Sequence, residues 1–309
     1  MTNACAVIGE SGSGKTILFE ALRQLRMIAR GASAAAGYGV WCETDFSELA
    51  VSIALPDGRL ATYAVKVRQV GLVANVVSET LSAGRTMFLR REGSEFVFDQ
   101  NGLDGTRVAS RKYSISGSAF ALGFLRAEGF GDPIMAMKRC LSNAWLLMPD
   151  PNAMIGLLDA ALPAEDIACR FLASYFVSRQ QVLPTLYAAI MANMAELCAG
   201  ITGFSVERDN FGGRYLAVHR ANDANSRGME MGTLSQGEKL CLLTAFVSAV
   251  NVLSGPIACF WDSPLNWVDK KTGAKMIQML WRSFRVHGQI VVLSPERDEV
   301  KWLGKIVRI

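Results

Sequence analysis

The chain contains 309 residues, 50% of them hydrophobic and 19% charged, with a formal net charge of +4 at pH 7. This balance excludes a disordered or fibrous protein, and the length suffices for one large domain or two smaller ones. The small positive charge is spread along the chain, so it neither demands nor excludes a nucleic-acid partner. The apolar runs stop well short of the ~20 residues that cross a bilayer, and the N-terminus lacks the basic start of a secretory signal. We therefore expect no membrane span.

The cysteines and histidines indicate a reducing compartment. None of the seven cysteines stands in Cys-x-x-Cys spacing, and most are surrounded by apolar residues. The two histidines, His219 and His287, are too few for a histidine-rich metal centre. Buried free thiols are typical of cytosolic proteins. We expect a cytoplasmic protein without a zinc centre or a disulfide framework.

The first third of the chain predicts a strand, a glycine loop, a helix and then hairpins. Residues 4–8 form a short apolar run that ends at a glycine, and residues 15–30 carry apolar side chains at helical spacing. Residues 49–67 and 85–99 read as two hairpins, which turn around Pro56-Asp57-Gly58 and Glu92-Gly93. Residues 40–112 are thus predicted to be mostly β-structure.

From about residue 115 to residue 200 the pattern becomes helical, with breaks near 129–133 and 149–152. Within it, apolar side chains at helical spacing cover only about two heptads, fewer than the three or four that indicate a coiled coil. These side chains are Leu183, Tyr187, Ile190, Met194 and Leu197. We expect a helical hairpin or a helix packed on a bundle. Residues 203–220 predict a further hairpin, and from Thr233 onward helix and strand alternate.

The stretch "GESGSGKT", residues 9–16, matches the phosphate-binding pattern G-x-x-x-x-G-K-[ST] at Gly9, Gly14, Lys15 and Thr16. The glycines let successive backbone N–H groups curve around phosphates, the lysine reaches the β- and γ-phosphates, and the threonine hydroxyl ligates Mg²⁺. The start of the helix adds its partial positive charge. A chance glycine-rich turn is the alternative, but the strand before the loop and the helix after it favour a nucleotide site.

Such a loop needs an acidic residue for the Mg²⁺, and Asp262 supplies one directly after the apolar run 257–261. The alternative is an aspartate that merely begins a turn before Pro264. Its surroundings favour the first interpretation, because a Ser-x-Gly-Glu turn opens an apolar helix upstream and a second buried strand, "QIVVL", follows downstream. The serine of that turn, Ser235, is either an anion site or an ordinary helix cap completed by Glu238, and both can hold at once.

These stretches carry a family resemblance. "LSQGEK" (234–239) resembles the signature motif of ABC-type ATPases, "CFWDSP" (259–264) their Walker B motif, "LNWVD" (265–269) their D-loop, and "IVVLSPE" (290–296) the strand that leads to their switch. About 250 residues separate the two Walker motifs, as in that family. The β-rich block and the hairpin at 203–220 are similar to the RecF/SMC-like branch, including OLD-type and abortive-infection ATPases.

The resemblance implies an α/β fold: a P-loop NTPase head of ABC type, with a β-rich side lobe and a helical subdomain. We expect three domains. Residues 1–112 would form an N-terminal ATPase lobe with the Walker A loop and the β block, residues 113–230 a helical subdomain with a hairpin insertion, and residues 231–309 a C-terminal ATPase lobe. The long coiled coil of SMC proteins is missing.

The resemblance also implies a homodimer in which two subunits enclose the same ATP and Mg²⁺. Lys15 and Thr16 of one subunit and Ser235 and Gly237 of the other would hold the nucleotide, with Thr16 and Asp262 as the metal ligands. The cofactor-binding residues implied in this way are Gly9, Glu10, Ser11, Gly12, Ser13, Gly14, Lys15, Thr16, Ser235, Gln236, Gly237, Glu238 and Asp269. The catalytic residues implied are Lys15, Asp262, Ser263 and Ser294.

Two positions depart from the family pattern. The glutamate that usually follows the Walker B aspartate is Ser263 here, and the switch histidine is Ser294. A serine hydroxyl is a poor base at neutral pH without a partner. Glu296 or Asp269 could replace it, although nothing in the sequence places either residue near a γ-phosphate. Slow hydrolysis and long-lived ATP-bound dimers are therefore expected.

Basic residues recur in the first half of the chain and allow two interpretations. A solvated face accounts for each group of them, whereas DNA lying across the groove of a dimer would need positive charge at suitable spacing. The residues are Arg23, Arg26, Arg30, Lys66, Arg68, Arg90, Arg91, Arg111 and Lys112.

We predict an ATP-binding head whose ATP-dependent dimerisation regulates an effector protein or engages DNA, in phage defence or DNA repair. As an enzyme it would be a slow ATPase that converts ATP and water to ADP and phosphate. The main alternative is a nucleotide-gated scaffold or partner subunit with little or no hydrolysis, which Ser263 and Ser294 favour. A kinase is a third class, but residues 234–239 would then have no role.

Overall fold

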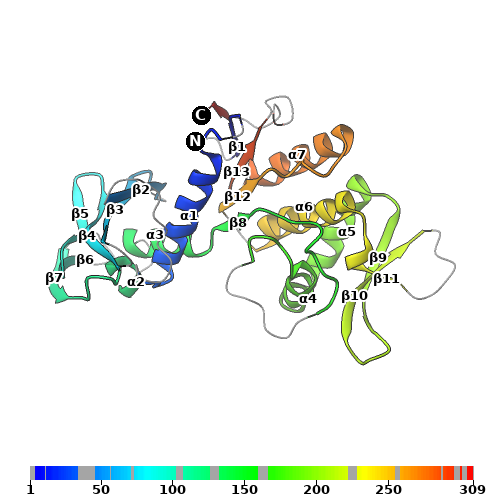
Figure 1. Ribbon diagram of the computed structural model, residues 1–309, viewed down its shortest axis with the longest axis horizontal. Coiled ribbons are helices and arrows are strands. Elements are labelled where there is room, and N and C mark those ends of the chain that lie inside the picture. Colours follow the sequence, from blue (N-terminus) through cyan, green and yellow to red (C-terminus); the bar gives the residue numbers. More distant parts are fainter. Residues whose placement is uncertain are drawn as a thin grey trace. The chain divides into compact units, whose positions relative to one another are not determined.

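The computed structural model describes residues 4–10, 12–33, 46–55, 57–70, 73–101, 107–125, 132–158, 166–221, 228–254, 258–286, 288–295, 300 and 305–308. The chain forms two compact units, one made of Met1–Thr16 with Trp145–Ile309 and the other of Ile17–Ala144 (Figure 1). Each unit has its own hydrophobic core. Among the helices in these described ranges, none is both long and apolar enough to cross a membrane.

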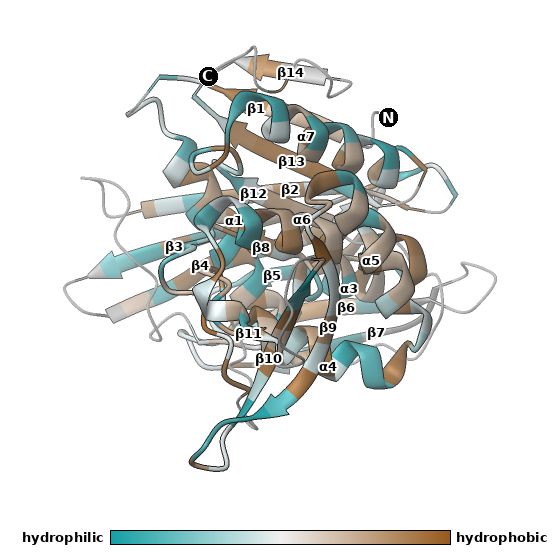
Figure 2. Cartoon of the chain, turned by 90° about the vertical axis from the view of Figure 1, so that its right-hand side faces the viewer, coloured by the Kyte–Doolittle hydropathy of each residue, from teal (hydrophilic) through white to brown (hydrophobic). Residues whose placement is uncertain are grey.

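The first unit is built on a five-stranded parallel sheet in the order β14-β1-β13-β12-β8. Its strands are β1 (Ala4–Ile8), β8 (Trp145–Leu147), β12 (Ala258–Asp262), β13 (Gln289–Ser294) and β14 (Lys305–Arg308). Strands of parallel sheets are usually buried on both faces and read as continuous apolar runs, as the colour of β13 in Figure 2 shows. The strands predicted before the glycine loop, before Asp262 and at "QIVVL" are confirmed.

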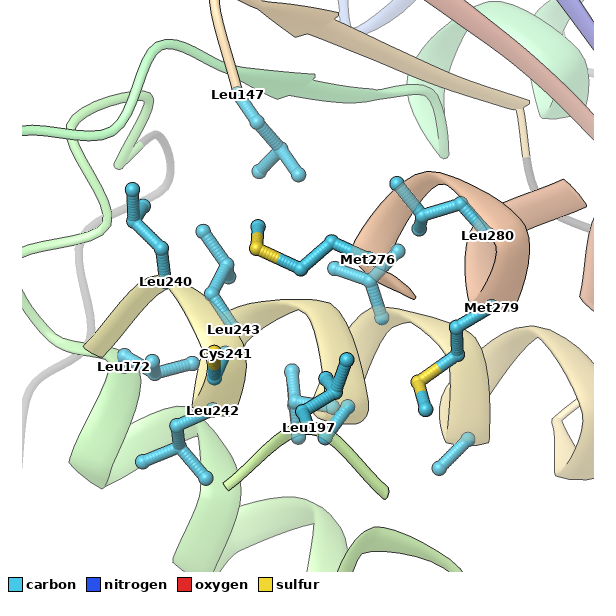
Figure 3. Close-up of a cluster of buried hydrophobic side chains, with 14 of the residues drawn as sticks. Leu147, Leu172, Leu197, Leu240, Cys241, Leu242, Leu243, Met276, Met279 and Leu280 are labelled. Atoms are coloured by element: carbon cyan, nitrogen blue, oxygen red, sulfur yellow. The ribbon is translucent and has the colours of Figure 1, made fainter. Parts of the chain in front are cut away.

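Four helices of the same unit complete this core: α4 (Leu172–Val182), α5 (Thr185–Leu197), α6 (Gln236–Leu253) and α7 (Lys270–Phe284). α6 is buried from Lys239 to Asn251, and Figure 3 shows its side chains among those of α4, α7 and β8. α5 follows α4 directly and packs mainly on α6, which fits the predicted alternative of a helix packed on a bundle better than an isolated helical hairpin. Cys241 and Cys259 are buried free thiols, and burial raises the pKa of Cys241 to about 12.

A small antiparallel sheet of the first unit contains β9 (Ile201–Arg208), β10 (Arg214–Arg220) and β11 (Met229–Glu230). β9 and β10 form the hairpin predicted for residues 203–220. In both views this hairpin extends beyond the helices of its own unit (Figures 1 and 2). A short 3₁₀ helix, Met231–Thr233, then leads into α6.

The second unit is entered by α1 (Lys15–Ala29) and contains a six-stranded antiparallel sheet with its strands in chain order. These are β2 (Phe46–Ala54), β3 (Leu60–Val70), β4 (Val73–Ala83), β5 (Thr86–Glu92), β6 (Glu95–Asn101) and β7 (Arg107–Ser114). Helices α2 (Ala121–Phe124) and α3 (Pro133–Ser142) and the buried side of α1 complete its core. Both predicted hairpins are confirmed, as β2–β3 and β5–β6, and Gly93 supplies the positive φ of +59° that the second turn requires.

An ion pair is buried inside the second unit. The side chains of Glu79 on β4 and Arg91 on β5 are both fully buried, and their closest nitrogen–oxygen distance is 3.7 Å. The Glu79 carboxylate also accepts hydrogen bonds from the Tyr63 hydroxyl at 2.9 Å and from two backbone N–H groups at the start of α2, each at 2.7 Å. Burial raises the pKa of Glu79, and these hydrogen bonds oppose that rise.

One feature differs from the sequence analysis. Residues 145–147 were predicted within a helical stretch, but they form β8, because this short apolar run pairs with β12. The domain boundaries predicted after residues 112 and 230 both fall inside the two compact units. The division into three domains, 1–112, 113–230 and 231–309, stays a prediction.

Candidate nucleotide-binding site

The candidate site lies at the carboxyl edge of the parallel sheet. In the register of the strands, Ile8 at the end of β1 is opposite Ser294 at the end of β13, and Asp262 at the end of β12 is opposite Leu293. The three strands therefore end at the same edge, and the glycine loop follows β1 there. Ligands of open α/β sheets bind in this position, beyond the carboxyl ends of the strands.

The glycine loop has the backbone conformation of an anion-binding turn. Gly12 and Gly14 have φ angles of +86° and +98°, which residues with a Cβ rarely adopt. The N–H of Ser13 donates to the carbonyl of Glu10 at 3.1 Å, and α1 begins at Lys15 directly after the loop. A glycine loop that leads directly into a helix start is the arrangement in which backbone N–H groups bind phosphates. Ser11 lies outside the described residues.

The Lys15 side chain folds back over its own loop. Its ammonium group donates to the carbonyl of Gly9, to the carbonyl of Glu10 at 2.7 Å and to the hydroxyl of Ser13 at 3.4 Å. The positive charge is therefore already held at the loop, where an anionic phosphate would be a stronger acceptor than these neutral oxygens. Thr16 is exposed in the first turn of α1. Its hydroxyl is available as a hard oxygen ligand.

Ser263 has an unusual backbone conformation directly after Asp262. Its φ angle is +50°, in the left-handed region, and its N–H donates to the carbonyl of Leu293 at 2.9 Å. Its hydroxyl donates to Oδ1 of Asp262 at 2.9 Å. This hydrogen bond holds the Asp262 carboxylate toward the Ser263 hydroxyl. The donor set of Asp262 and Thr16, a carboxylate and a hydroxyl, suits Mg²⁺.

The left-handed conformation of Ser263 predicts how substitutions there affect stability. Glycine adopts this conformation without strain, so Ser263→Gly should leave the free energy of unfolding unchanged or raise it by up to about 1 kcal/mol. The β-branched substitution Ser263→Val should lower it by about 1–3 kcal/mol. Urea unfolding measures both. Ser254 is the matched control, because its φ of −94° gives glycine no advantage. A loss in Ser263→Gly as large as that in Ser254→Gly would contradict the explanation.

Ser294, the residue at the predicted switch position, ends β13. Its side chain is buried, and it lies beside Ile8 in the sheet. The pairing of β13 with β1 therefore places Ser294 near the start of the glycine loop, but its side chain is not on the surface. Glu296, considered as a substitute base, lies outside the described residues.

The start of α6 is a capping box, as one of the two interpretations of Ser235 predicted. The N–H of Ser235 donates to Oε2 of Glu238 at 3.0 Å, the N–H of Glu238 donates to the Ser235 hydroxyl at 3.3 Å, and that hydroxyl also donates to Oε2 at 2.9 Å. Arg220 holds the other oxygen, with a nitrogen–oxygen distance of 2.7 Å. Burial works against ionisation of Glu238, but the hydrogen bonds from Ser235 and the charge of Arg220 lower its pKa. The anion-binding role of Ser235 stays a prediction.

The residues on either side of Ser235 connect α6 to the segment after β8. The Gln236 amide donates to Asn152 at 2.8 Å, and the buried Lys239 ammonium donates to the carbonyls of Pro151 at 2.9 Å and Met154 at 3.3 Å. Because Leu147 of β8 pairs with Trp261, this segment begins at the same sheet edge as Asp262. Sequence reasoning missed both β8 and the contacts of the segment after it with α6. The signal available in the sequence was an apolar run followed by prolines around 149–151.

Asp269 caps a helix. Its Oδ1 accepts from the N–H groups of Lys271 and Thr272 at the start of α7, both at 3.0 Å. Hydrogen bonding by Thr272 is the main cause that lowers the pKa of Asp269. A Cβ on Gly237 would lie 3.4 Å from the carbonyl of Trp267, so the first turn of α6 lies against the segment that precedes Asp269. The predicted nucleotide contacts of Gly237 and Asp269 are not tested by these positions.

The basic residues of the second unit are largely compensated by neighbours. Arg90 pairs with Glu92 at 2.6 Å and Lys112 with Glu95 at 2.8 Å. The charged groups of Lys66 and Arg68 lie over the ring of Phe46, at 4.9 Å and 5.4 Å from its centroid. Arg91 is buried, so it belongs neither to a solvated face nor to a DNA contact. For most of these charges, this arrangement fits a solvated face better than a phosphate-binding surface.

No model of a known protein family matches the sequence, and no curated protein matches it. Solved structures do match. A crystal structure of an SMC head bound to the C-winged helix domain of ScpA covers 99% of this chain and 86% of its own, at 16% identity and a TM-score of 0.55. The SMC head domain from Thermotoga maritima covers 97% and 82%, at 11% identity and a TM-score of 0.43. The chain thus has the α/β fold of an ABC-type P-loop NTPase head with a β-rich side lobe and a helical subdomain, and SMC heads are among its solved structural neighbours.

Proposed function

We propose that this chain is an ATP-binding head that forms an ATP-dependent homodimer and hydrolyses ATP slowly. The observation that carries the proposal is Ser263, which occupies the position of the usual catalytic glutamate and donates its hydroxyl proton to Asp262. A head that has a complete phosphate-binding loop but no base at this position is expected to bind ATP and to hydrolyse it slowly.

The residues of the glycine loop would contact the phosphates of the nucleotide. The phosphates would take the place of the carbonyl oxygens that now hold the Lys15 ammonium, and the start of α1 would add the partial positive charge of a helix N-terminus. Thr16 and Asp262 would hold Mg²⁺, which neutralises charge between the phosphates when it is bound. Ser263 keeps the Asp262 carboxylate in one orientation through its hydroxyl.

The alternative bases have little support. Asp269 already accepts hydrogen bonds from two backbone N–H groups at the start of α7. If its carboxylate turned toward a water molecule, these capping hydrogen bonds would be lost and the helix would be less stable. Ser294 is buried. These positions favour the variant of the proposal in which the head is a nucleotide-gated scaffold with almost no turnover.

The second subunit would complete the site with Ser235 and Gly237, by resemblance to ABC-type heads. Ser235 is exposed at the start of an 18-residue helix, and the N-terminus of a helix favours an anion. The dimer would regulate an effector protein or engage DNA in the cytoplasm, and the RecF/SMC-like resemblance favours phage defence or DNA repair. The SMC head of the first comparison is bound to a winged-helix domain, which supports a partner protein here as well.

The first test is the molar mass of the protein by size-exclusion light scattering, with and without Mg-ATP, with phosphate release recorded on the same sample. A dimer that forms with Mg-ATP and releases little phosphate is expected. A dimer with rapid phosphate release would contradict slow hydrolysis, and a monomer under all conditions would contradict the homodimer.

Ser263→Glu tests the role of this position directly. A carboxylate supplied here as a base should speed phosphate release and shorten the lifetime of the ATP dimer, each by at least about tenfold, because a positioned base contributes about 10²–10⁴ to a rate. Ser263→Gly is the matched control, since it also removes the hydroxyl but adds no base. An unchanged dimer lifetime in Ser263→Glu would count against the proposal.

A further inference from the structure

Both oxygens of the Glu238 carboxylate have partners at the start of α6. Oε2 accepts from the N–H group and from the hydroxyl of Ser235, at 3.0 Å and 2.9 Å. Oε1 accepts from the guanidinium of Arg220 at 2.7 Å and faces the Cys198 thiol at the end of α5, with a sulfur–oxygen distance of 3.9 Å. Burial works to raise the pKa of Glu238, but the hydrogen bonds from Ser235 and the charge of Arg220 lower it. Glu238 therefore carries a negative charge at neutral pH, in direct contact with Ser235.

A negative charge in this place has two opposite effects. It stabilises α6, because a carboxylate near the N-terminus of a helix interacts favourably with the first backbone N–H groups and with the helix dipole. It opposes nucleotide binding, because the γ-phosphate of ATP is also an anion and like charges repel each other. Without a compensating charge, the cap that begins α6 would weaken the part of the site that Ser235 and Gly237 are proposed to complete.

Arg220 supplies the compensating charge from another element of the same unit. It is the last residue of β10, and strand alternation places it on the same face as Leu216 and Val218, which are buried in the core. Its Nε also donates to the sulfur of Met229 on β11 at 3.4 Å. The guanidinium is thus held at the edge of the core by one contact with β11 and one with Glu238 of α6.

The Arg220–Glu238 pair is less exposed than a surface ion pair of the same unit. The side chains of Arg220 and Glu238 are 34% and 17% accessible, whereas those of Arg282 on α7 and Glu196 on α5 are 50% and 41% accessible. Partly buried charges are screened less by salt than exposed ones. If one partner of the Arg220–Glu238 pair is removed, water compensates the remaining charge only in part.

We propose that Arg220 is a positioning residue of the nucleotide site. It neutralises Glu238, so that the capping box holds Ser235 in place without repelling the γ-phosphate of ATP bound to the other subunit. Arg220 acts through Glu238 and touches neither the phosphates nor the metal. The inference rests on the proposed function, since it concerns the half of the site that the second subunit contributes.

The proposal predicts that the two members of this ion pair affect dimerisation in opposite directions. Removal of Arg220 leaves an uncompensated carboxylate facing the phosphate, whereas removal of the charge of Glu238 leaves a cation there. An ion pair that only stabilised the fold would behave differently, because loss of either partner would then do similar harm.

Sedimentation equilibrium in Mg-ATP, which gives the dissociation constant of the dimer, tests the proposal. Arg220→Met should raise this constant at least about tenfold, and Arg220→Lys should recover most of the loss because the ammonium restores the charge. Glu238→Gln should dimerise as tightly as the wild type or more tightly, since glutamine can replace glutamate in a capping box. The double variant Arg220→Met/Glu238→Gln should dimerise more tightly than Arg220→Met. Arg282→Met is the matched control, because it removes the exposed ion pair of the same unit and should dimerise like the wild type.

Equal losses in Arg220→Met and Glu238→Gln would overturn the proposal, because they would assign the pair to fold stability alone. Unchanged dimerisation of Arg220→Met would overturn it too, and would leave the proposed function intact. If Arg220→Met does not fold, Glu238→Gln still decides: a weaker dimer contradicts the proposal, and an equal or tighter one supports it. A wild-type protein that stays monomeric in Mg-ATP would contradict the proposed function, and this proposal with it.

Discussion

Lys15→Ala is expected to abolish ATP binding, with an affinity loss of at least about a hundredfold, or roughly 2.7 kcal/mol. The Lys15 ammonium is the only charged group that the described structure places within hydrogen-bond distance of the loop oxygens of Gly9, Glu10 and Ser13. Without it, phosphates in the loop would meet backbone N–H groups but no full positive charge. Isothermal titration calorimetry with Mg-ATP measures the change.

The same variant should fold normally. The carbonyls of Gly9 and Glu10 lie beside an exposed loop residue, Gly12, and water can replace the lost ammonium. Its thermal midpoint should therefore match that of Lys271→Ala, a control that removes an exposed lysine from α7. Normal ATP affinity in Lys15→Ala would mean that the glycine loop is not the phosphate site.

The parts of the fold that the sequence could predict are those with local causes. β1, the glycine loop and α1 are contiguous, and the positive φ angles of Gly12 and Gly14 follow from the residue type. The β2–β3 and β5–β6 hairpins turn at short glycine-containing segments. The Ser235–Glu238 box follows from residues three apart at the start of an apolar helix.

The features that sequence reasoning missed have non-local causes. β8 is three residues long, too short for its period to be read, and it is a strand because β12 lies beside it. The left-handed conformation of Ser263 accompanies a hydrogen bond from its N–H group to the carbonyl of Leu293, 30 residues away in sequence. Lys239 is the last residue of the signature-like stretch 234–239, and it is buried with its ammonium group donating to the carbonyl of Pro151 in the segment after β8.

The same limit applies to charge. Nothing in "LRREGSEF" distinguishes Arg90 from Arg91, but strand alternation sends one side chain to solvent and the other into the core. The sequence could tell which of the two arginines faces solvent only if the position of the hydrophobic core were already known. The basic pair therefore became two residues with unrelated roles, one in an exposed ion pair and one in a buried network.

Arg91→Met is expected to lower the free energy of unfolding of the second unit by about 3–5 kcal/mol. The guanidinium donates to the backbone carbonyls of Gly93 at 2.7 Å, Ser116 at 3.0 Å and Ala119, so it ties the β5–β6 turn to the segment before α2. Methionine fills a similar volume but leaves these acceptors without their donor and leaves Glu79 buried without its opposite charge.

The loss should grow with pH. Because burial raises the pKa of Glu79 above its ordinary value of 4.5, folding favours the protonated carboxyl group, and stability falls as the pH rises from about 4.5 through the folded-state pKa. The charge of Arg91 lowers that pKa, so its removal extends the interval upward. Urea unfolding followed by circular dichroism at about pH 5 and about pH 8, fitted with two transitions for two units, measures the difference, since these pH values lie roughly half a unit and three and a half units above the ordinary pKa of 4.5.

Arg90→Ala, one residue away, is the matched control. Its ion pair with Glu92 is exposed, with side chains 66% and 72% accessible, so its loss should change stability by no more than about 0.5 kcal/mol. The double variant Glu79→Gln/Arg91→Met should recover part of the loss, because no unpaired buried charge remains. If Arg91→Met and Arg90→Ala unfold alike, the buried pair does not stabilise the second unit. A recovery in the double variant would show instead that the cost in Arg91→Met comes from the isolated Glu79 charge, and that the carbonyls released by Arg91 contribute the remainder.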